Sequence, residues 1–195
     1  MIRIDLHVHT IYSEDSAISP KFLVDQLYAH PKIKGVAVTD HDTLEGYIKA
    51  KKLAKAYEDI VIVPGIEVST INGHLIVLGV EEIKPCLTTI ENVVDFAKEN
   101  SGLIMVPHPY KITGIGDLAR KINTDAIETL NSHATRFENK LAEKLACEKN
   151  VPCVVGTDAH QPYELWHVCN EVDARPDLHE VLESIKNGKT RIVST

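Results

Sequence analysis

The sequence contains no long hydrophobic segment and no densely basic one. No apolar run approaches the roughly 20 residues of a membrane-spanning helix, so we expect no membrane span. Arg3 and Asp5 interrupt the N-terminal apolar stretch, which argues against a signal peptide. The net charge of −7 and the lack of a basic stretch argue against general nucleic-acid binding, because that function needs a cationic surface.

Cysteine is sparse, and no two cysteines form a CxxC pair. Cys86, Cys147, Cys153 and Cys169 are widely spaced. This spacing argues against a structural zinc site built on cysteine. We therefore expect reduced, partly buried thiols in a cytoplasmic protein.

The composition that remains is that of a globular protein. The 195 residues are 44% hydrophobic, with no internal repeat, linker or low-complexity segment, which predicts a single domain over residues 1–195. Short apolar runs typical of strands are Ile2–Val8, Gly35–Thr39, Ile60–Pro64, His74–Val80, Leu103–Pro107, Ala126–Leu130, Cys153–Thr157, Val168–Val172 and Arg191–Val193. Segments with helical periodicity are Pro20–Ala29, Leu44–Tyr57, Ile90–Glu99, Ile115–Lys121, Thr135–Lys149 and Leu178–Lys186.

Strands that alternate with helices predict an α/β fold with a largely parallel sheet. An open doubly wound sheet and a closed barrel are the two candidate architectures. No glycine-rich phosphate loop follows the first strand, which weakens the open, nucleotide-binding alternative. Histidine and carboxylate residues follow at least five different strands, and this spread favours a barrel, whose strands converge on one mouth.

Two pairs of polar residues lie at predicted strand ends. His7 and His9 are two positions apart, as are Asp158 and His160, so each pair projects from one face of its strand. Imidazole and carboxylate groups together suit Zn, Mn or Fe. The alternative is that they are ordinary polar residues at a strand end.

The segment 39–43, Thr-Asp-His-Asp-Thr, follows another predicted strand. Asp40 and His41 are adjacent, so we expect one to be a metal ligand and the other to hold an imidazole in its tautomer. We favour His41 as the ligand. Asp42 or Thr43 would also cap the helix that follows.

Three further candidates lie near predicted strands. Glu67 follows Val-Pro-Gly-Ile, and its carboxylate can bridge two cations; a solvated glutamate is the alternative. His74 opens a predicted strand, where it is either a ligand or a capped strand-end histidine. His108 lies between Pro107 and Pro109, which fix the backbone on both sides and would preorganise a ligand.

In this order the motifs resemble the PHP family, the polymerase and histidinol phosphatase superfamily, over nearly the whole chain. The markers are Leu6-His7-Val8-His9-Thr10, Thr39-Asp40-His41-Asp42-Thr43, Gly65-Ile66-Glu67-Val68-Ser69, Pro107-His108-Pro109 and Gly156-Thr157-Asp158-Ala159-His160. The resemblance implies a distorted seven-stranded βα barrel of the TIM-like, PHP type. It also implies two or three divalent ions (Mn, Zn or Fe) at the strand carboxyl ends and metal-dependent phosphoester hydrolysis by a small stand-alone member.

Carried over by position, the resemblance gives a role to each candidate ligand. His7, His9, Glu67 and Asp158 resemble the ligands of one ion. Glu67 is similar to the family's bridging carboxylate, shared with an ion that also uses His108.

The resemblance adds ligands that spacing alone does not suggest. Asp15 resembles the family's acidic ligand, acting together with His41 and His160, and Glu14 is a less favoured substitute. His74 resembles a histidine that follows the bridging glutamate in small nucleotide-phosphatase members, although the spacing here is short.

Asn131, His133 and Arg136 occupy the region where relatives contact substrate, and Arg136 could clamp a phosphate through two hydrogen bonds. The expected reaction is hydrolysis of a small phosphorylated substrate, a nucleotide or a sugar or amino-alcohol phosphate, by a metal-bridged hydroxide. Asp158 or His160 would carry a proton to the leaving oxygen.

Two other functions compete with this interpretation. One is an amidohydrolase-type metal hydrolase, for which a carbamylated lysine would be expected near the fourth strand, where the sequence has none. The other is a non-catalytic PHP-like subunit of an RNA-processing or polymerase complex. The acidic charge and the full set of candidate ligands make that one the least favoured.

Overall fold

The computed structural model describes residues 1–84 and 86–194. In that part of the chain nine strands form one sheet, in the order β7-β6-β5-β4-β3-β2-β1-β8-β9. The strands are β1 (Ile2–Val8), β2 (Ile33–Val38), β3 (Val61–Thr70), β4 (Gly73–Leu78), β5 (Leu103–Val106), β6 (Ala126–Asn131), β7 (Cys153–Gly156), β8 (Val168–Val172) and β9 (Thr190–Ser194). The helices are α1 (Pro20–Ala29), α2 (Glu45–Ala54), α3 (Ile90–Glu99), α4 (Arg136–Lys149) and α5 (Leu178–Lys186), with the 3-10 helices η1 (Gly116–Lys121) and η2 (Pro162–Glu164).

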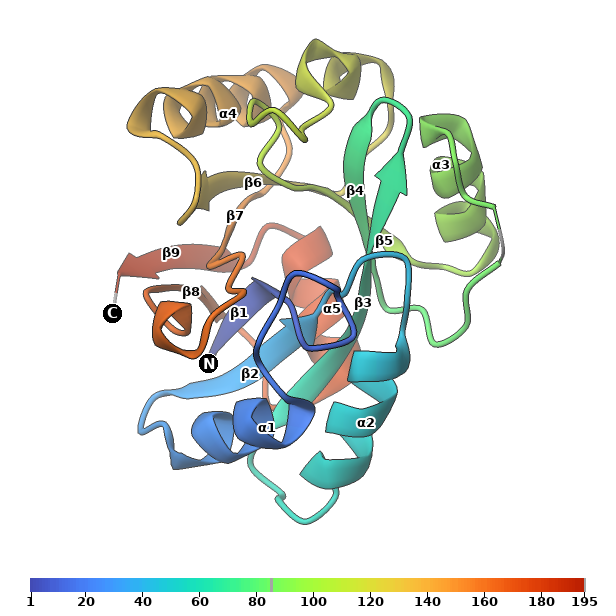
Figure 1. Cartoon of the computed structure of the whole chain (residues 1–195). Helices are drawn as coiled ribbons and strands as arrows, with labels where there is room; N and C mark the ends of the chain where they lie inside the picture. The colour runs from blue at the N-terminus through green and yellow to red at the C-terminus, as the bar shows by residue number, and fades with distance from the viewer. Residues whose placement is uncertain (85, 195) are drawn as a thin grey trace.

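The sheet curls into a nearly closed barrel, which confirms the predicted α/β barrel fold (Figure 1). Closure occurs where β7 returns beside β1 and β8. The backbone N–H of Asp158, just after β7, donates to the carbonyl of His7 on β1 at 2.8 Å. The buried side chain of Asn170 on β8 bonds both the N–H and the carbonyl of Val155 on β7. These contacts hold the last barrel strand against the first.

The sheet departs from the predicted, largely parallel arrangement at β4 and β8. β4 pairs antiparallel with β3 and β5, and β8 pairs antiparallel with β1 and β9. Only Ile71 and Asn72 separate β3 from β4, which is too short for a parallel crossover and makes a hairpin. Gly73 completes the turn at φ +124°, a conformation that other residues rarely adopt. The start of β4 therefore lies at the same end of the barrel as the end of β3.

Four of the helices, α1, α3, α4 and α5, begin with side-chain caps. α2 follows Leu44, which caps nothing, although Thr43 Oγ1 accepts the backbone N–H of Glu45 at 3.2 Å. Ser19 Oγ accepts the backbone N–H of Phe22 at 3.1 Å at the start of α1. Thr135 and Glu138 bond each other's backbone N–H groups in a capping box that opens α4. Such caps satisfy N–H groups that a helix leaves unpaired in its first turn.

Apolar side chains pack in three clusters between the sheet and the helices. α1 and α2 cover β1 to β3 with Leu23 and Tyr47, and α3 and α4 cover β4 to β6 with Phe96 and Leu145. α5 contributes Ile185 to the third cluster, behind the strands in the view of Figure 1. Burying one leucine or isoleucine side chain stabilises the fold by about 1.5–3 kcal/mol. No helix in the described part of the chain is long and apolar enough to cross a membrane.

Candidate metal centre

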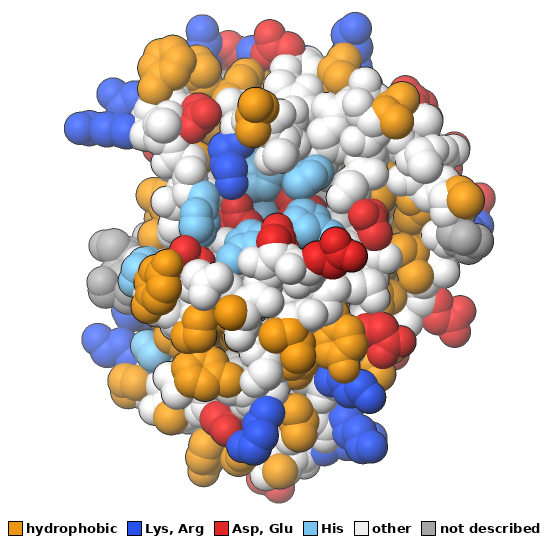
Figure 2. All heavy atoms as spheres, in the orientation of Figure 1, with side chains coloured by type: hydrophobic (Ala, Val, Ile, Leu, Met, Phe, Trp, Pro, Cys, Tyr) orange, Lys and Arg blue, Asp and Glu red, His pale blue; other side chains and the backbone are white. Residues whose placement is uncertain are grey.

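Histidine and carboxylate side chains gather at the barrel mouth, where strand ends converge. Figure 2 shows them as pale-blue and red groups in a hollow on this face. They surround a cavity of about 240 Å³, and His7 and His9 are fully buried beside it. The cavity is lined by Asp15, His41, Glu67, His74, His108, Lys111, Thr113, His133, Asp158 and His160.

Glu67 is the carboxylate that contacts the most imidazoles. It is 1% exposed and lies within β3, because that strand runs past the predicted end at Pro64. Its Oε2 is 3.3 Å from His7 Nε2 and 3.1 Å from His9 Nε2. Its Oε1 is 3.0 Å from His108 Nε2. A carboxylate with both oxygens facing imidazoles from several strands has the geometry that a bridging ligand requires.

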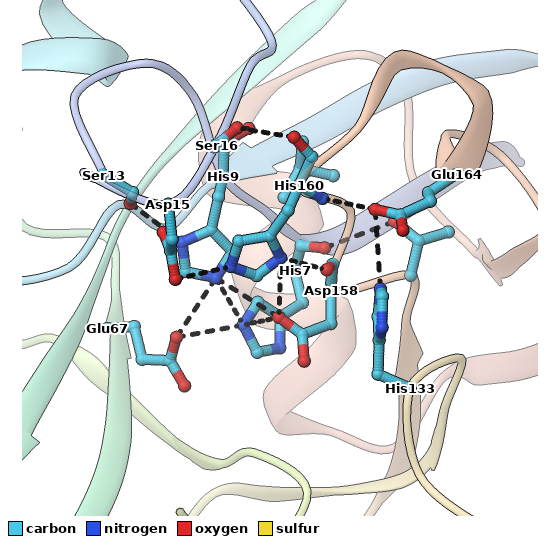
Figure 3. Close-up of polar contacts among 12 residues, drawn as sticks. His7, His9, Ser13, Asp15, Ser16, Glu67, His133, Asp158, His160 and Glu164 are labelled. Carbon is cyan, nitrogen blue, oxygen red and sulfur yellow. Dashed lines mark hydrogen bonds and ion pairs between the residues drawn. The ribbon is translucent and has the colours of Figure 1, made fainter.

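Asp158 faces two of the same imidazoles from the other side of the barrel seam (Figure 3). Its Oδ1 is 3.3 Å from His7 Nε2 and 3.4 Å from His9 Nε2. With Glu67 these residues form a fully buried group whose ligand atoms all lie within 4.8 Å of one another. The structure thus brings together the four residues that the resemblance assigns to one ion.

A second group shares His9 and is more open to solvent. His160 Nε2 lies 3.2 Å from Asp15 Oδ2, and His41 Nε2 lies 3.7 Å from the same oxygen. The rings of His9 and His160 stack at 4.2 Å between centroids. The ligand atoms of these four residues also lie within 4.8 Å of one another. Asp15 comes from the loop after β1, and its side chain is 55% exposed.

His74 and His41 form a third group with Glu67. His74 Nδ1 lies 2.9 Å from Glu67 Oε1, which the β3–β4 hairpin makes possible. The buried Nδ1 of His41 has no hydrogen-bond partner among the described residues and lies 3.5 Å from Glu67 Oε2. Imidazole nitrogens and carboxylate oxygens facing each other in this way fit a divalent cation such as Zn, Mn or Fe.

In His7 and His160 the ring nitrogen that faces away from the centre has a hydrogen-bond acceptor, whereas the buried Nδ1 of His108 has no partner among the described residues. His7 Nδ1–H donates to Glu128 at 3.0 Å, and His160 Nδ1–H donates to the carbonyl of Asp158 at 2.7 Å. Each bond leaves an Nε2 lone pair aimed inward, which is what a metal ligand needs.

Asp40 acts on a histidine through a serine. His9 Nδ1–H donates to Ser13 Oγ at 2.9 Å, and Ser13 Oγ–H donates to Asp40 at 3.0 Å. Asp40 also accepts from the backbone and hydroxyl of Thr10 and belongs to none of the four groups of candidate ligands, the fourth being His133, His160 and Glu164. Asp40 thus reaches the His9 imidazole only through Ser13 Oγ, and its expected role in holding a tautomer stays a prediction.

Charges in the centre depend strongly on one another. Burial disfavours protonated His7, but the carboxylates of Asp158, Glu128 and Glu67 outweigh it and raise the His7 pKa well above 6.5. Burial likewise opposes the charge on His9, yet hydrogen bonds to Asp158 and Glu67 raise its pKa to about 9. Burial would raise the pKa values of Glu67 and Asp158, but His7 and the other imidazoles hold both well below the ordinary range. An incoming cation must therefore displace protons.

The three expected substrate residues lie in different environments. His133 lines the cavity, with Nε2 3.5 Å from Glu164 Oε2. Asn131 is buried and donates from Nδ2 to Glu128 and to Asp158, so it supports the centre from behind. Arg136 is the exposed first residue of α4 and has no hydrogen bond or ion pair among the described residues.

Lys111 and Glu128 are among the side chains at the centre that were not predicted from the sequence. Lys111 lies three residues after His108, and its Nζ is 2.8 Å from Asp158 Oδ2. A single loop lysine carries no motif by which it could have been found. Glu128 is fully buried in β6. A charged residue inside the apolar run Ala126–Leu130 was a usable signal, because glutamate is almost never fully buried unless it is paired.

Two family models match the chain. The one described as PHP domain matches residues 5–156, and the one described as PHP-associated matches residues 136–190. Two uncharacterised proteins of Methanocaldococcus jannaschii are similar in sequence. One is 31% identical over 154 residues, with 72% of this chain and 89% of the relative covered. The other is 29% identical over 180 residues, with 87% of this chain and 68% of the relative covered.

Solved structures share the fold at low sequence identity. A two-domain protein from Bacteroides vulgatus, containing a predicted PHP-like metal-dependent phosphoesterase, has a TM-score of 0.82 at 19% identity. The match covers 99% of this chain and 64% of that longer protein. An amidohydrolase from Chromobacterium violaceum, with bound sulfate and no metal, has a TM-score of 0.72 at 17% identity, with 98% and 97% covered.

Proposed function

The chain belongs to the PHP domain family, and from this premise we propose that it is a metal-dependent phosphoesterase of small phosphorylated substrates. The observation that carries the proposal is the buried group of His7, His9, Glu67 and Asp158, whose ligand atoms converge beside a cavity. Burying this many ionisable groups together costs desolvation free energy, and the binding of metal ions would offset that cost.

The three overlapping groups support two or three divalent ions, Mn, Zn or Fe. The buried group would hold one ion, and Asp15, His41 and His160 with His9 would hold another. Glu67, His74 and His108 would hold a third ion, or would bind one of the other two ions together with its own ligands. Bound cations would make water a nucleophile near neutral pH and offset charge on the phosphoryl oxygens.

Lys111 supports a phosphoryl group as the occupant of the cavity. Among the described residues lining the cavity it is the only lysine or arginine, and its ammonium lies beside Asp158 at the centre. We propose that Lys111 binds a phosphoryl oxygen, which makes it a better-placed anchor than the exposed Arg136. Asp158 and His160 border the same cavity, so both stay our proposed proton carriers to the leaving oxygen.

The leaving group has room in a larger cavity that adjoins the centre. This cavity measures about 640 Å³, and it shares Asp15 and His41 with the smaller one. Its lining is Tyr12, Glu14, Asp15, His41, Asp42, Thr43 and Ser69. Because three carboxylates and no lysine or arginine line it, a second phosphate there would be repelled. The geometry favours a monophosphate over a bisphosphate.

Phosphate release tests the proposal. Chelator-treated protein is reloaded with Mn, Zn or Fe and assayed on nucleotides, sugar phosphates and amino-alcohol phosphates. We expect metal-dependent release from at least one monoester. Glu67→Gln should remove an ion and most activity with the fold intact, whereas Glu143→Gln, an exposed carboxylate on α4, should change neither. Phosphatase activity that persists in excess chelator, or no phosphate release with any metal, would contradict the proposal.

An amidohydrolase-type reaction is the second candidate, favoured by the likeness to the Chromobacterium structure. The same ligands could activate water against a carbonyl carbon. Adding amides and carboxylic esters to the substrate panel separates the two reactions. We also propose that residues 1–195 form a single domain, because β8 and β9 extend the sheet that carries the centre.

A further inference from the structure

Glu128 is a buried carboxylate in the middle of β6, and its side chain has no exposed surface. Among the described residues its only ion pair is with His7. A carboxylate in such a place is costly unless several donors satisfy it. We propose that Glu128 is a positioning residue of the metal centre, setting the tautomer of His7 and the placement of His108 and Asp158.

The two oxygens of Glu128 accept from three donors. Oε1 accepts from His7 Nδ1–H at 3.0 Å. Oε2 accepts from the backbone N–H of His108 at 2.8 Å and from Asn131 Nδ2 at 2.9 Å. Asn131 Nδ2 also donates to Asp158 Oδ2 at 3.2 Å. One carboxylate thereby connects candidate ligands that come from β1, the loop after β5 and the loop after β7.

The bond to His108 holds an unusual backbone. His108 has φ +25°, which is rare for a residue other than glycine, and it lies between two prolines. Such a conformation persists only where surrounding contacts hold it in place. The backbone N–H of His108 points at Glu128 Oε2, and its Nε2 meets Glu67. Glu128 therefore fixes the direction in which this imidazole enters the centre.

Gly156 makes the contact between Glu128 and His7 possible. A Cβ at position 156 would lie 2.3 Å from His7 Cβ and 2.5 Å from Glu128 Oε1. Any side chain there would push the carboxylate and the imidazole apart. The glycine in Val-Val-Gly-Thr is thus explained by the packing of Glu128 against β1.

An amide cannot replace this carboxylate. In Glu128→Gln, an NH₂ group facing His108 and Asn131 would meet two donors, so the amide oxygen must take that side. The NH₂ group then faces His7 and requires Nδ1 to accept. The imidazole proton moves to Nε2, which points at Glu67 and Asp158. A cation there needs a lone pair on Nε2, so this variant should lose affinity for the ion held by the buried group.

Asp5 provides a matched control, because it is equally buried but accepts in a pattern that an amide can keep. Its Oδ1 accepts the backbone N–H groups of His7 and Thr157, at 3.3 and 3.0 Å. Its Oδ2 meets the Thr157 hydroxyl, which can donate or accept. In Asp5→Asn, the oxygen keeps the two backbone bonds and the NH₂ donates to that hydroxyl. No donor is left facing another donor.

Zinc binding and the position of the His7 proton test the inference. Elemental analysis counts zinc per chain, competition with a chelator gives the affinity, and ¹H–¹⁵N NMR shows which His7 nitrogen is protonated. We expect wild type and Asp5→Asn to bind zinc equally, and zinc-loaded His7 to be protonated at Nδ1 only. In Glu128→Gln we expect one ion fewer, or an affinity lower by about 10–100-fold, and a His7 with its proton on Nε2 and none on Nδ1.

The outcomes separate this inference from the proposed reaction. The inference rests on the proposed metal centre but not on phosphoester hydrolysis, so zinc binding without hydrolysis leaves it standing. Equal zinc affinity in Glu128→Gln and wild type would overturn it. Wild type that binds no zinc would overturn both the centre and the role of Glu128. If Glu128→Gln does not fold, the wild-type spectrum decides, and a proton on His7 Nε2 in zinc-loaded protein contradicts the inference.

Discussion

At the scale of single residues, charges balance one another in the buried group of His7, His9, Glu67 and Asp158, which is almost entirely shielded from solvent. His9 has no exposed surface, yet its pKa is raised to about 9 because bonds to Asp158 and Glu67 outweigh the effect of burial. Without a cation, the positive charge of the protonated histidines offsets the repulsion between the neighbouring carboxylates. A bound cation would take over that role at the same nitrogens.

This balance predicts how the metal-free protein responds to pH. A histidine whose folded pKa is raised stabilises the fold fully below its unfolded pKa of about 6.5, and that stability is lost as pH rises through about 9. Asp5, whose pKa burial raises to about 7, has largely finished titrating by pH 8. We expect the melting temperature of chelator-treated protein to fall between pH 8 and 9.5. The melting temperature of metal-loaded protein should change much less over the same pH range. Equal falls in the two melting temperatures would contradict the view that the same histidine nitrogens bind protons or metal.

The position of Lys111 predicts that its substitution weakens substrate binding without changing metal binding. Lys111→Met should raise KM for the best phosphomonoester by about 10-fold or more, because a charge-assisted hydrogen bond is worth about 1.5–3 kcal/mol. Metal content should stay the same, and Lys111→Arg should restore part of the affinity. Lys140→Met, at an exposed position of α4, is the control. If Lys111 were only a counter-ion of Asp158, its loss would tighten metal binding and leave KM unchanged.

Candidate ligands that stand in short sequence motifs could be predicted, whereas residues that reach the centre only through long-range strand placement could not. His7, His9 and Asp158 are predicted from a spacing of two and from their position near strand ends, although in the structure His9 and Asp158 lie just past the ends of β1 and β7. Lys111, which follows β5, and Glu128, on β6, reach the centre only because the curled sheet brings the ends of these strands to the same mouth as β7 and β1. Pairings across 47 and 121 positions in the sequence leave no local pattern.

At the scale of elements, the β3–β4 hairpin decides which end of the barrel a side chain reaches. A histidine that opens a parallel strand would lie at the end away from the mouth. His74 reaches Glu67 because β4 runs antiparallel to β3. The sequence predicts both strands but not their relative direction, and it is the hairpin that places His74 beside Glu67.

Gly73 tests that hairpin. It has φ +124°, and a Cβ there would lie 2.7 Å from the backbone of Thr113 and Gly114. Gly73→Ala should therefore destabilise the protein by more than about 1 kcal/mol and weaken the His74 contact. Gly116→Ala is the matched control, with φ +55° and nothing within 4 Å of its Cβ. Urea unfolding measures both, and equal losses would show that backbone conformation alone, rather than packing of the turn, is responsible.

At the scale of the whole molecule, the candidate centre lies across the seam that closes the barrel. His7 belongs to β1 and Asp158 follows β7, and the backbone N–H of Asp158 donates to the carbonyl of His7. His9 N–H donates to Ala159 in the same way at 3.0 Å. An ion that binds both His7 and Asp158 would tie the two sides together. Catalytic ligands and barrel closure would then depend on the same few contacts.

Hydrogen exchange measures this coupling. Opening of the seam would separate the ligands, so an ion that binds only the closed form stabilises it by about 2.7 kcal/mol at a free concentration of 100 times Kd. We expect the amides of His9 and Asp158 to exchange roughly 100-fold more slowly in metal-loaded than in chelator-treated protein. The amide of Leu23 in α1, which packs on the far side of β1 to β3, should change little. Equal slowing at all three amides would mean that the ion stabilises the whole fold and does not act at the seam.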